Sequence, residues 1–134
     1  MTLEQAIHER WAASQALAAL LPADRVTTGR SSRGALPYVT LLRERSRTAL
    51  RTNAGDTLEE VTLRMSVWHE DYDAARAIVD EIRAAFDRSQ FELAGGSRVL
   101  QMRRTGDRTL QHGDGLWQLT IRFLVQICLD ADIC

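Results

Sequence analysis

Apolar and polar side chains alternate over more than ten residues near the C-terminal end of the chain. The apolar positions are Trp117, Leu119, Ile121, Phe123, Val125, Ile127 and Leu129. Successive side chains of a β-strand point to opposite faces, so this period of two predicts a long strand with one buried face. The stretch from Val61 to Val67 alternates in the same way and predicts a second such strand. The fold must therefore contain a sheet with an apolar face to cover.

Two segments carry the helical period instead. Residues 2–21 repeat apolar side chains at helical spacing, and Thr2 with Gln5 matches a capping box. Pro22 is expected to end that helix. A second helix is expected to begin after Asp71, which would cap its N-terminus, and to present one apolar stripe to the sheet. That stripe consists of Tyr72, Ala75, Ile78, Val79, Ile82 and Phe86.

The remaining elements are shorter or more polar. We expect an extended piece at 25–28, a loop at 29–34, a strand from 36 to 47, a turn at 53–56, a break at 95–96, a strand at 98–104, a polar loop at 105–108 and a turn at 112–115. The predicted order is α-β-β-β-α-β-β. Turns between consecutive strands favour antiparallel pairing. The predicted fold class is therefore α+β, a two-layer sandwich of a mainly antiparallel sheet with two helices on one face, in a single domain spanning 1–134.

Length and composition fit a globular chain. It has 134 residues, 45% of them hydrophobic and 26% charged, and no apolar run approaches the roughly 20 residues of a membrane helix. The acidic, amphipathic N-terminus does not resemble a signal peptide, which favours the cytoplasm as the site of synthesis and assembly. Cys128 and Cys134 suit neither a disulfide framework nor a zinc site. Two free thiols are expected, with a pair between chains as the alternative.

The basic residues are distributed unevenly. All seventeen are arginines, and the segment from Arg25 to Arg51 has seven of them but a single acid, Glu44. The coding bias of a GC-rich genome explains the absence of lysine. Clustered arginines also suit an interface, because the planar guanidinium pairs with carboxylates in a fixed geometry. In an extended chain Arg43, Arg45, Arg47 and Arg51 are expected to form a stripe on one side.

No polar cluster matches a catalytic or metal site. His69, Asp71 and Asp73 could be read as metal ligands, but Asp71 is already explained as a helix cap. His8 begins a zincin-like pattern that lacks its second histidine. The segment from His112 to Gly115 has the composition of a turn. We therefore expect no enzymatic activity, no cofactor and no metal.

Two further features admit alternatives. Gly95-Gly96-Ser97-Arg98 is too short and isolated for a phosphate-binding loop. The arginine segment could bind nucleic acid, but no aromatic residue is interleaved with it and the pI is near 6.3. Trp68 falls on the opposite face of its strand from Val67, so it is expected outside the core.

The layout resembles the tail-terminator (tail-completion) family of tailed bacteriophages, which has an equivalent component in gene transfer agents. The residues that carry the likeness are 17–22 (LAALLP), 36–39 (LPYV), 61–68 ending in Val67-Trp68, 71–76 (DYDAAR) and 115–123 (GLWQLTIRF). The resemblance covers essentially the whole chain. It implies a structural virion protein, with no active site, that forms a ring of six copies.

That resemblance also implies partners. The ring would close the head-proximal end of the tail tube, contact the tube protein and dock to the head or neck connector, with DNA passing through it. The protein would assemble in the bacterial cytoplasm and reside in the virion tail, with no membrane and no sequence-specific nucleic acid. The alternatives are another neck or tail ring component, or a small α+β module that binds a ligand or nucleic acid.

Contacts between copies are expected to involve the polar, arginine-bearing loops and the acidic outer face of the second helix. Such loops are where interaction surfaces usually lie. The candidate interface residues are Arg30, Arg33, Arg43, Arg45, Arg47, Arg51, Asp80, Glu81, Asp87 and Arg108.

Overall fold

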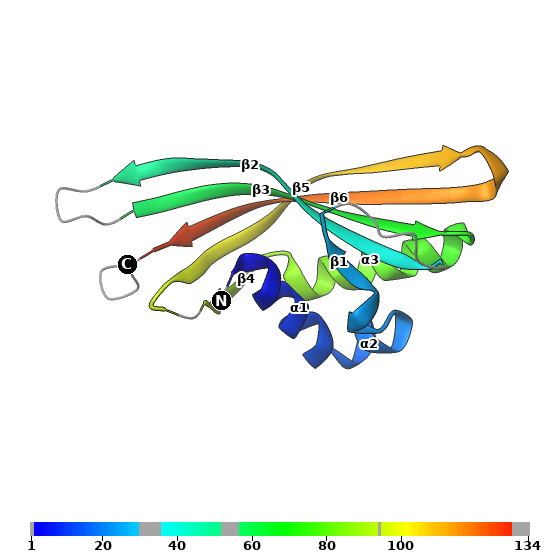
Figure 1. Ribbon diagram of the computed structural model, residues 1–134, viewed down its shortest axis with the longest axis horizontal. Coiled ribbons are helices and arrows are strands. Elements are labelled where there is room, and N and C mark those ends of the chain that lie inside the picture. The colour runs from blue at the N-terminus through cyan, green and yellow to red at the C-terminus, as the bar shows by residue number, and fades with distance from the viewer. Residues whose placement is uncertain (1, 30–35, 52–56, 94, 130–134) are drawn as a thin grey trace.

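The structure, a computed structural model, describes residues 2–29, 36–51, 57–93 and 95–129. These residues form a curved six-stranded mixed sheet with three α-helices, all of them on one side of it (Figure 1). The helices are α1 (Leu3–Ala13), α2 (Gln15–Leu20) and α3 (Tyr72–Phe86). The strands are β1 (Val26–Thr28), β2 (Tyr38–Arg51), β3 (Thr57–His69), β4 (Ser89–Glu92), β5 (Arg98–His112) and β6 (Leu116–Cys128).

The strand order in the sheet is β1-β2-β3-β6-β5-β4. Four neighbouring pairs are antiparallel, as predicted, but β1 pairs parallel to the start of β2, with Val26 opposite Val39. The prediction of antiparallel pairing failed at β1. The connection between Thr28 and Tyr38 is longer than a tight turn, so β2 can begin beside the beginning of β1. The observed order also includes β4, a four-residue strand that the sequence analysis missed.

The core lies between the helices and the central strands. The predicted sheet face is confirmed for the odd-numbered residues of β3 from Val61 to Val67 and of β6 from Leu119 to Ile127, which are all buried. Leu129, which the alternation placed on the same face, lies beyond the end of β6 and is 42% exposed, so the prediction is wrong there. The α3 stripe is buried from Ala75 to Phe86. Tyr72 is the exception, since it is 38% exposed and contacts Trp117 edge-on at a centroid distance of 4.9 Å. Burial of these side chains supplies most of the stabilisation of the fold.

The single N-terminal helix expected from 2–21 is two helices. Ser14 ends α1, and its side chain accepts a hydrogen bond from the Leu17 N–H (3.3 Å), so it also caps α2. Serine competes for backbone hydrogen bonds in this way and favours a cap over a helix interior. Pro22 lies just after α2, as predicted, and the capping box of Thr2 and Gln5 is present. The break lets Trp11 and Leu17 both reach the core.

The prediction of a polar loop at 105–108 is wrong. β5 continues through it to His112, paired with β6 except at an irregularity between Arg104 and Gly106. Polar side chains are tolerated there because β5 lies outside β6 in the sheet and most of its residues from Thr105 to His112 are exposed to solvent. The backbone groups of β5 that point toward β6 are satisfied by that strand whatever the side chains are. The tip is a short 3-10 turn, Gly113–Gly115.

Cys128 at the end of β6 is buried and disulfide-bonded, so the expectation of a free thiol at this position is wrong. Cys134 lies outside the described residues, as does the turn predicted at 53–56.

Candidate interface surfaces

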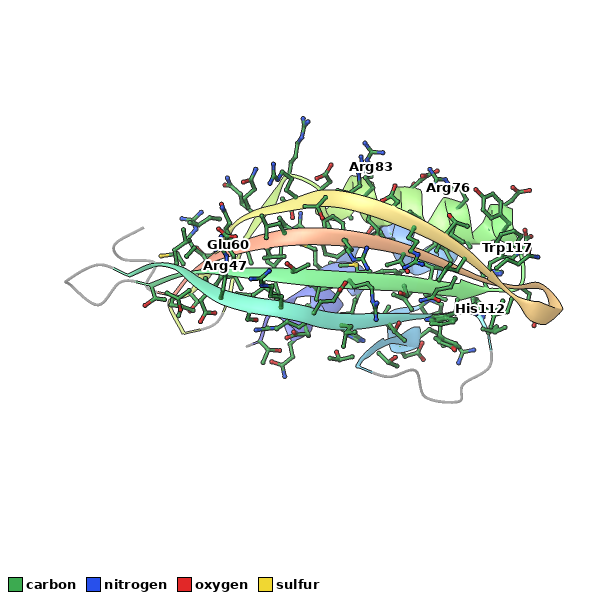
Figure 2. All side chains as sticks on the ribbon, turned by 90° about the horizontal axis from the view of Figure 1, so that it is seen from above. Arg47, Glu60, Arg76, Arg83, His112 and Trp117 are labelled. Atoms are coloured by element: carbon green, nitrogen blue, oxygen red, sulfur yellow. The ribbon has the colours of Figure 1, made fainter. Side chains whose placement is uncertain are left out.

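The face of the sheet that carries no helix is here called the open face. Its side chains come from the positions of β2, β3, β6 and β5 that alternate with the buried ones (Figure 2). Ser66, Thr120 and Thr40 lie on it at neighbouring register positions and are nonetheless buried. Arg64 and Arg122 lie along one side of this hydroxyl patch, Arg108 lies at its end opposite Thr120, and Trp68 and Gln118 lie along the other side. The open face is therefore polar and largely basic.

A β-bulge splits the predicted arginine stripe. Arg43 pairs opposite the core residue Leu63, and Arg45 is opposite Thr62, with one extra residue between them in β2. Because the pairing shifts by one, Arg43 faces the helices whereas Arg45 and Arg47 lie on the open face. Arg43 forms an ion pair with Glu4 of α1 at 3.0 Å. The prediction that these arginines share one side is therefore wrong.

The extra residue of the bulge, Glu44, lies on the open face and serves two arginines. Its carboxylate is 2.9 Å from Arg122 Nε and 3.9 Å from Arg64 Nε. Arg47 pairs with Glu60 at 3.1 Å. The register also puts Arg103 and Arg108 of β5 on this face. Among the described residues of the four long strands, the arginines on this face thus outnumber the carboxylates.

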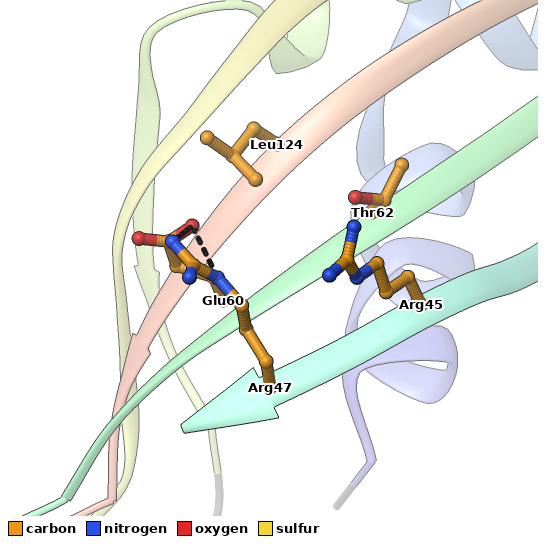
Figure 3. A pocket seen from close by; sticks show the side chains of 5 residues that line it. All are labelled: Arg45, Arg47, Glu60, Thr62 and Leu124. Atoms are coloured by element: carbon orange, nitrogen blue, oxygen red, sulfur yellow. Dashed lines mark hydrogen bonds and ion pairs between the residues drawn. The ribbon is translucent and has the colours of Figure 1, made fainter. Parts of the chain in front are cut away.

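Arg45 and Arg47 flank a shallow hollow on the open face. It has a volume of about 250 Å³ and is lined by Arg45, Arg47, Glu60, Thr62 and Leu124 (Figure 3). The Arg47 guanidinium points across the strand to Glu60, while Arg45 projects beside Thr62. Arg45 is therefore the better placed of the two to receive a carboxylate from another molecule.

An aromatic stack forms the other end of the open face. Trp68 stacks between Tyr38, at 6.1 Å, and His112, at 5.5 Å, and its Nε1 donates a hydrogen bond to Thr40 Oγ1 (3.2 Å). His112 Nε2 is 2.9 Å from Gln118 Oε1. The expectation that Trp68 lies outside the core is confirmed. The stack borders a hollow of about 310 Å³.

The outer side of α3 is acidic. With its caps, this helix has five carboxylates and two arginines, namely Asp71, Asp73, Asp80, Glu81, Asp87, Arg76 and Arg83. Asp80 is exposed and forms only a long ion pair with Arg76, at 3.8 Å. Asp87 is engaged within the subunit, because its Oδ1 accepts a hydrogen bond from the backbone N–H of Arg104 (2.9 Å). Of the candidate interface acids, Asp80 is exposed and Glu81 partly exposed, so these two are more available to a neighbour than Asp87.

Other predicted positions are described in part or not at all. Arg30 and Arg33 lie outside the described residues. Arg51 is in β2, but its side chain is not described. Arg108 is exposed on β5.

The histidine and aspartates considered as metal ligands have structural roles. His69 Nδ1 accepts a hydrogen bond from the backbone N–H of Asp71 (2.9 Å), and the Asp71 carboxylate accepts one from the Asp73 N–H (2.9 Å). The described part of the chain contains no cluster of three histidines, cysteines or acids that could hold a metal. No helix in that part has the length and apolar character to cross a membrane.

These surfaces can be compared with known proteins. The family model of tail completion protein gp17 matches residues 5–127. The chain belongs to this family. The resemblance found in the sequence is thereby confirmed, and the family consists of structural tail proteins of phage rather than of enzymes.

A solved structure shows the same fold. A chain in the virion of a native gene transfer agent particle superposes with a TM-score of 0.76, covering 94% of each chain at 17% sequence identity. No curated protein matches the sequence. At this identity the likeness extends to the fold, and the surface residues of this chain have to be interpreted on their own chemistry.

Proposed function

We propose that this protein forms a ring of six copies that closes the head-proximal end of a tail tube and docks it to the head connector. The tail-completion family supports the tail as its place. The single observation that carries the ring is the opposite charge of the two flanks. The flank at β2 presents Arg45 and Arg47, and the flank at α3 presents Asp80 and Glu81.

The two flanks lie on opposite sides of the molecule. Figure 2 shows Arg76 and Arg83 of α3 outside the edge formed by β5, whereas Arg47 lies on β2 at the other edge. A head-to-tail contact, in which different surfaces of two copies meet, generates a closed ring when its rotation closes. Arginine–carboxylate pairs in such a contact would add geometric register as well as attraction.

The proposed ring has three kinds of partner. Neighbouring copies meet through the flanks, the tail tube protein meets one end of the ring, and the head or neck connector meets the other, with DNA passing through the centre. Assembly would take place in the bacterial cytoplasm, and the product would reside in the virion tail. The free protein can remain monomeric until the tube offers a template.

The experiment reverses the charge of the basic flank. The double variant Arg45→Glu/Arg47→Glu is expected to abolish ring formation or tail attachment while the monomer keeps its circular dichroism spectrum. Adding Asp80→Arg and Glu81→Arg to the same chain restores the net charge and reverses the other flank, so assembly should return. Normal assembly of the double variant at physiological salt would exclude these flanks as the interface.

The excess of arginine on the open face favours one other function, nucleic-acid binding. That function predicts that affinity for DNA falls steeply with salt, because released counterions drive such binding. Filter binding at two salt concentrations separates the two functions, since the ring proposal requires no affinity of the isolated subunit for DNA.

A further inference from the structure

The outer edge of β2 is unpaired over most of its length. β1 covers only Val39 to Leu41, and the Gly29 N–H donates to the Leu41 carbonyl (2.7 Å) where that pairing ends. From Leu42 to Arg51 no described strand lies on this side. The N–H and C=O groups that point away from β3 therefore form a strand edge that can accept another strand.

The outer edge of β5 is unpaired at its other end. β4 covers Arg98 to Met102, and the Asp87 carboxylate then takes the Arg104 N–H. From Thr105 to His112 no described strand pairs on this side. Within the described residues, β2 and β5 thus each present an unpaired stretch of edge, and the two stretches lie on opposite borders of the sheet and toward opposite ends of the molecule (Figure 1).

These two edges fit each other in direction. β2, β3, β6 and β5 are successive antiparallel neighbours, so β5 runs antiparallel to β2. When two copies lie side by side in the same orientation, the β5 edge of one meets the β2 edge of the next as an ordinary antiparallel pair. We propose that copies of this chain join by this pairing, which extends one sheet from subunit to subunit. The inference rests on the proposed ring but not on the charged flanks, because Arg45 and Arg47 lie on the open face of the sheet and Asp80 and Glu81 on the side of the helices.

The side chains select one register. Open-face residues must lie opposite open-face residues, because a slip of one position exchanges the faces. With Leu42 opposite Leu110, two apolar side chains meet, and the bulged pair of Glu44 and Arg45 then lies opposite Arg108. If β5 moves by two residues toward the C-terminal end of β2, with the bulge counted, Arg108 lies opposite Arg47, another positive charge. A shift the other way sets Leu42 against Arg108 and the bulged pair of Glu44 and Arg45 against Gly106.

This register also has the stagger that a closed sheet needs. Within one copy Leu42 shares a row with Arg64, Arg122 and Gly106. Leu110 is four residues beyond Gly106 (110 − 106 = 4), so each copy is displaced by four residues over four strands. With a rise of about 3.3 Å per residue and about 4.8 Å between strands, that displacement corresponds to a tilt of roughly 35°, within the usual range of closed β-barrels.

The charges and bulges at both edges have a second consequence. Charged residues and bulges are common means by which proteins prevent free edges from pairing indiscriminately. Here β2 is irregular around Glu44 and β5 around Thr105. These charges and bulges would therefore disfavour other registers and other strand partners. They would permit the register in which Arg108 lies opposite the bulge at Glu44.

The test places two cysteines across the predicted junction. Leu42→Cys with Leu110→Cys is expected to give a ladder of covalently linked copies on a non-reducing gel after mild oxidation. The register control is Leu42→Cys with Arg108→Cys, whose positions would be about 7–8 Å apart, beyond the Cα separation of about 4.4–6.8 Å that a disulfide allows. The single variants control for the native cysteines.

The gel is run on isolated tails and on concentrated purified protein, and hydrogen exchange of residues 42–47 and 106–110 is compared before and after assembly. A ladder with amide protection in both segments supports the inference. Protein present in tails without ladder or protection overturns the edge pairing and leaves the proposed function standing. A ladder in purified protein that never joins tails supports the pairing and overturns the proposed function. Neither ladder nor tail attachment overturns both.

Discussion

Trp11 of α1 donates a hydrogen bond from its indole Nε1 to the backbone carbonyl of Leu21, 2.9 Å away and out of contact with water. The bond joins the last turn of the first helix to the C-terminal cap of the second. It satisfies a carbonyl at a helix C-terminus, one of the groups that a helix leaves unpaired. The indole is the largest fully buried side chain, so the packing of both N-terminal helices depends on it.

Trp11→Phe is expected to lower the free energy of unfolding by about 1–3 kcal/mol, because the change leaves a buried carbonyl unsatisfied and removes part of an aromatic side chain. Urea denaturation followed by circular dichroism measures it. Trp68→Phe is the matched control, since its hydrogen bond to Thr40 lies at a partly exposed surface and should cost less. Equal losses in the two variants would contradict the role given to the Trp11 bond.

Asp71→Ala is expected to cost about 0.5–2 kcal/mol, the usual effect of removing a helix N-cap. The Asp71 side chain accepts hydrogen bonds from the N–H groups of Asp73 and Ala74. Asp73→Ala, in the first turn, loses only a favourable charge near the helix N-terminus and should cost less. Thermal unfolding of both variants distinguishes capping from charge. A larger effect at Asp73 would argue against the cap.

Ile121→Ala is expected to cost about 2–5 kcal/mol, as buried aliphatic truncations do. Ile121 is fully buried opposite Met65 in the centre of the sheet. Leu124→Ala removes a similar volume from the open face of the same strand and should be markedly milder. Chemical denaturation gives both values. A change below about 0.5 kcal/mol at Ile121 would mean that the core face is assigned wrongly.

Chelator treatment is expected to leave the melting temperature unchanged, and elemental analysis should find no stoichiometric metal. The reason is that His69 and Asp71 already serve backbone N–H groups at the start of α3. Differential scanning fluorimetry with and without the chelator measures the shift. A loss of fold on chelation would redirect attention to His69, Asp71 and Asp73.

The sequence was sufficient wherever a local rule decides the outcome. The alternation from Val61 to Val67 and along β6 identified the buried face, because side-chain direction in a strand follows from its period of two. Asp71 and the Thr2–Gln5 box marked two helix starts, because capping depends on residues three positions apart. The family likeness was visible from the same features.

The candidate interface was predictable only in composition. The sequence showed that arginines gather between Arg25 and Arg51, but it assigned Arg43, Arg45 and Arg47 to one side. An irregularity at Glu44 in the pairing of β2 with β3 separates them, and no local rule places a bulge, because the partner strand decides which residue is left over.

Tertiary structure decided the rest. The sequence by itself determined which residues are buried in the central strands, where the main helices begin and to which family the chain belongs. Only the fold decided that β5 stays a strand through Thr105 and Arg108. Its backbone partners there come from β6, and the polarity of the β5 side chains does not reveal that pairing. Only the fold leaves the edges of β2 and β5 free, because a strand edge is defined by the neighbours it lacks.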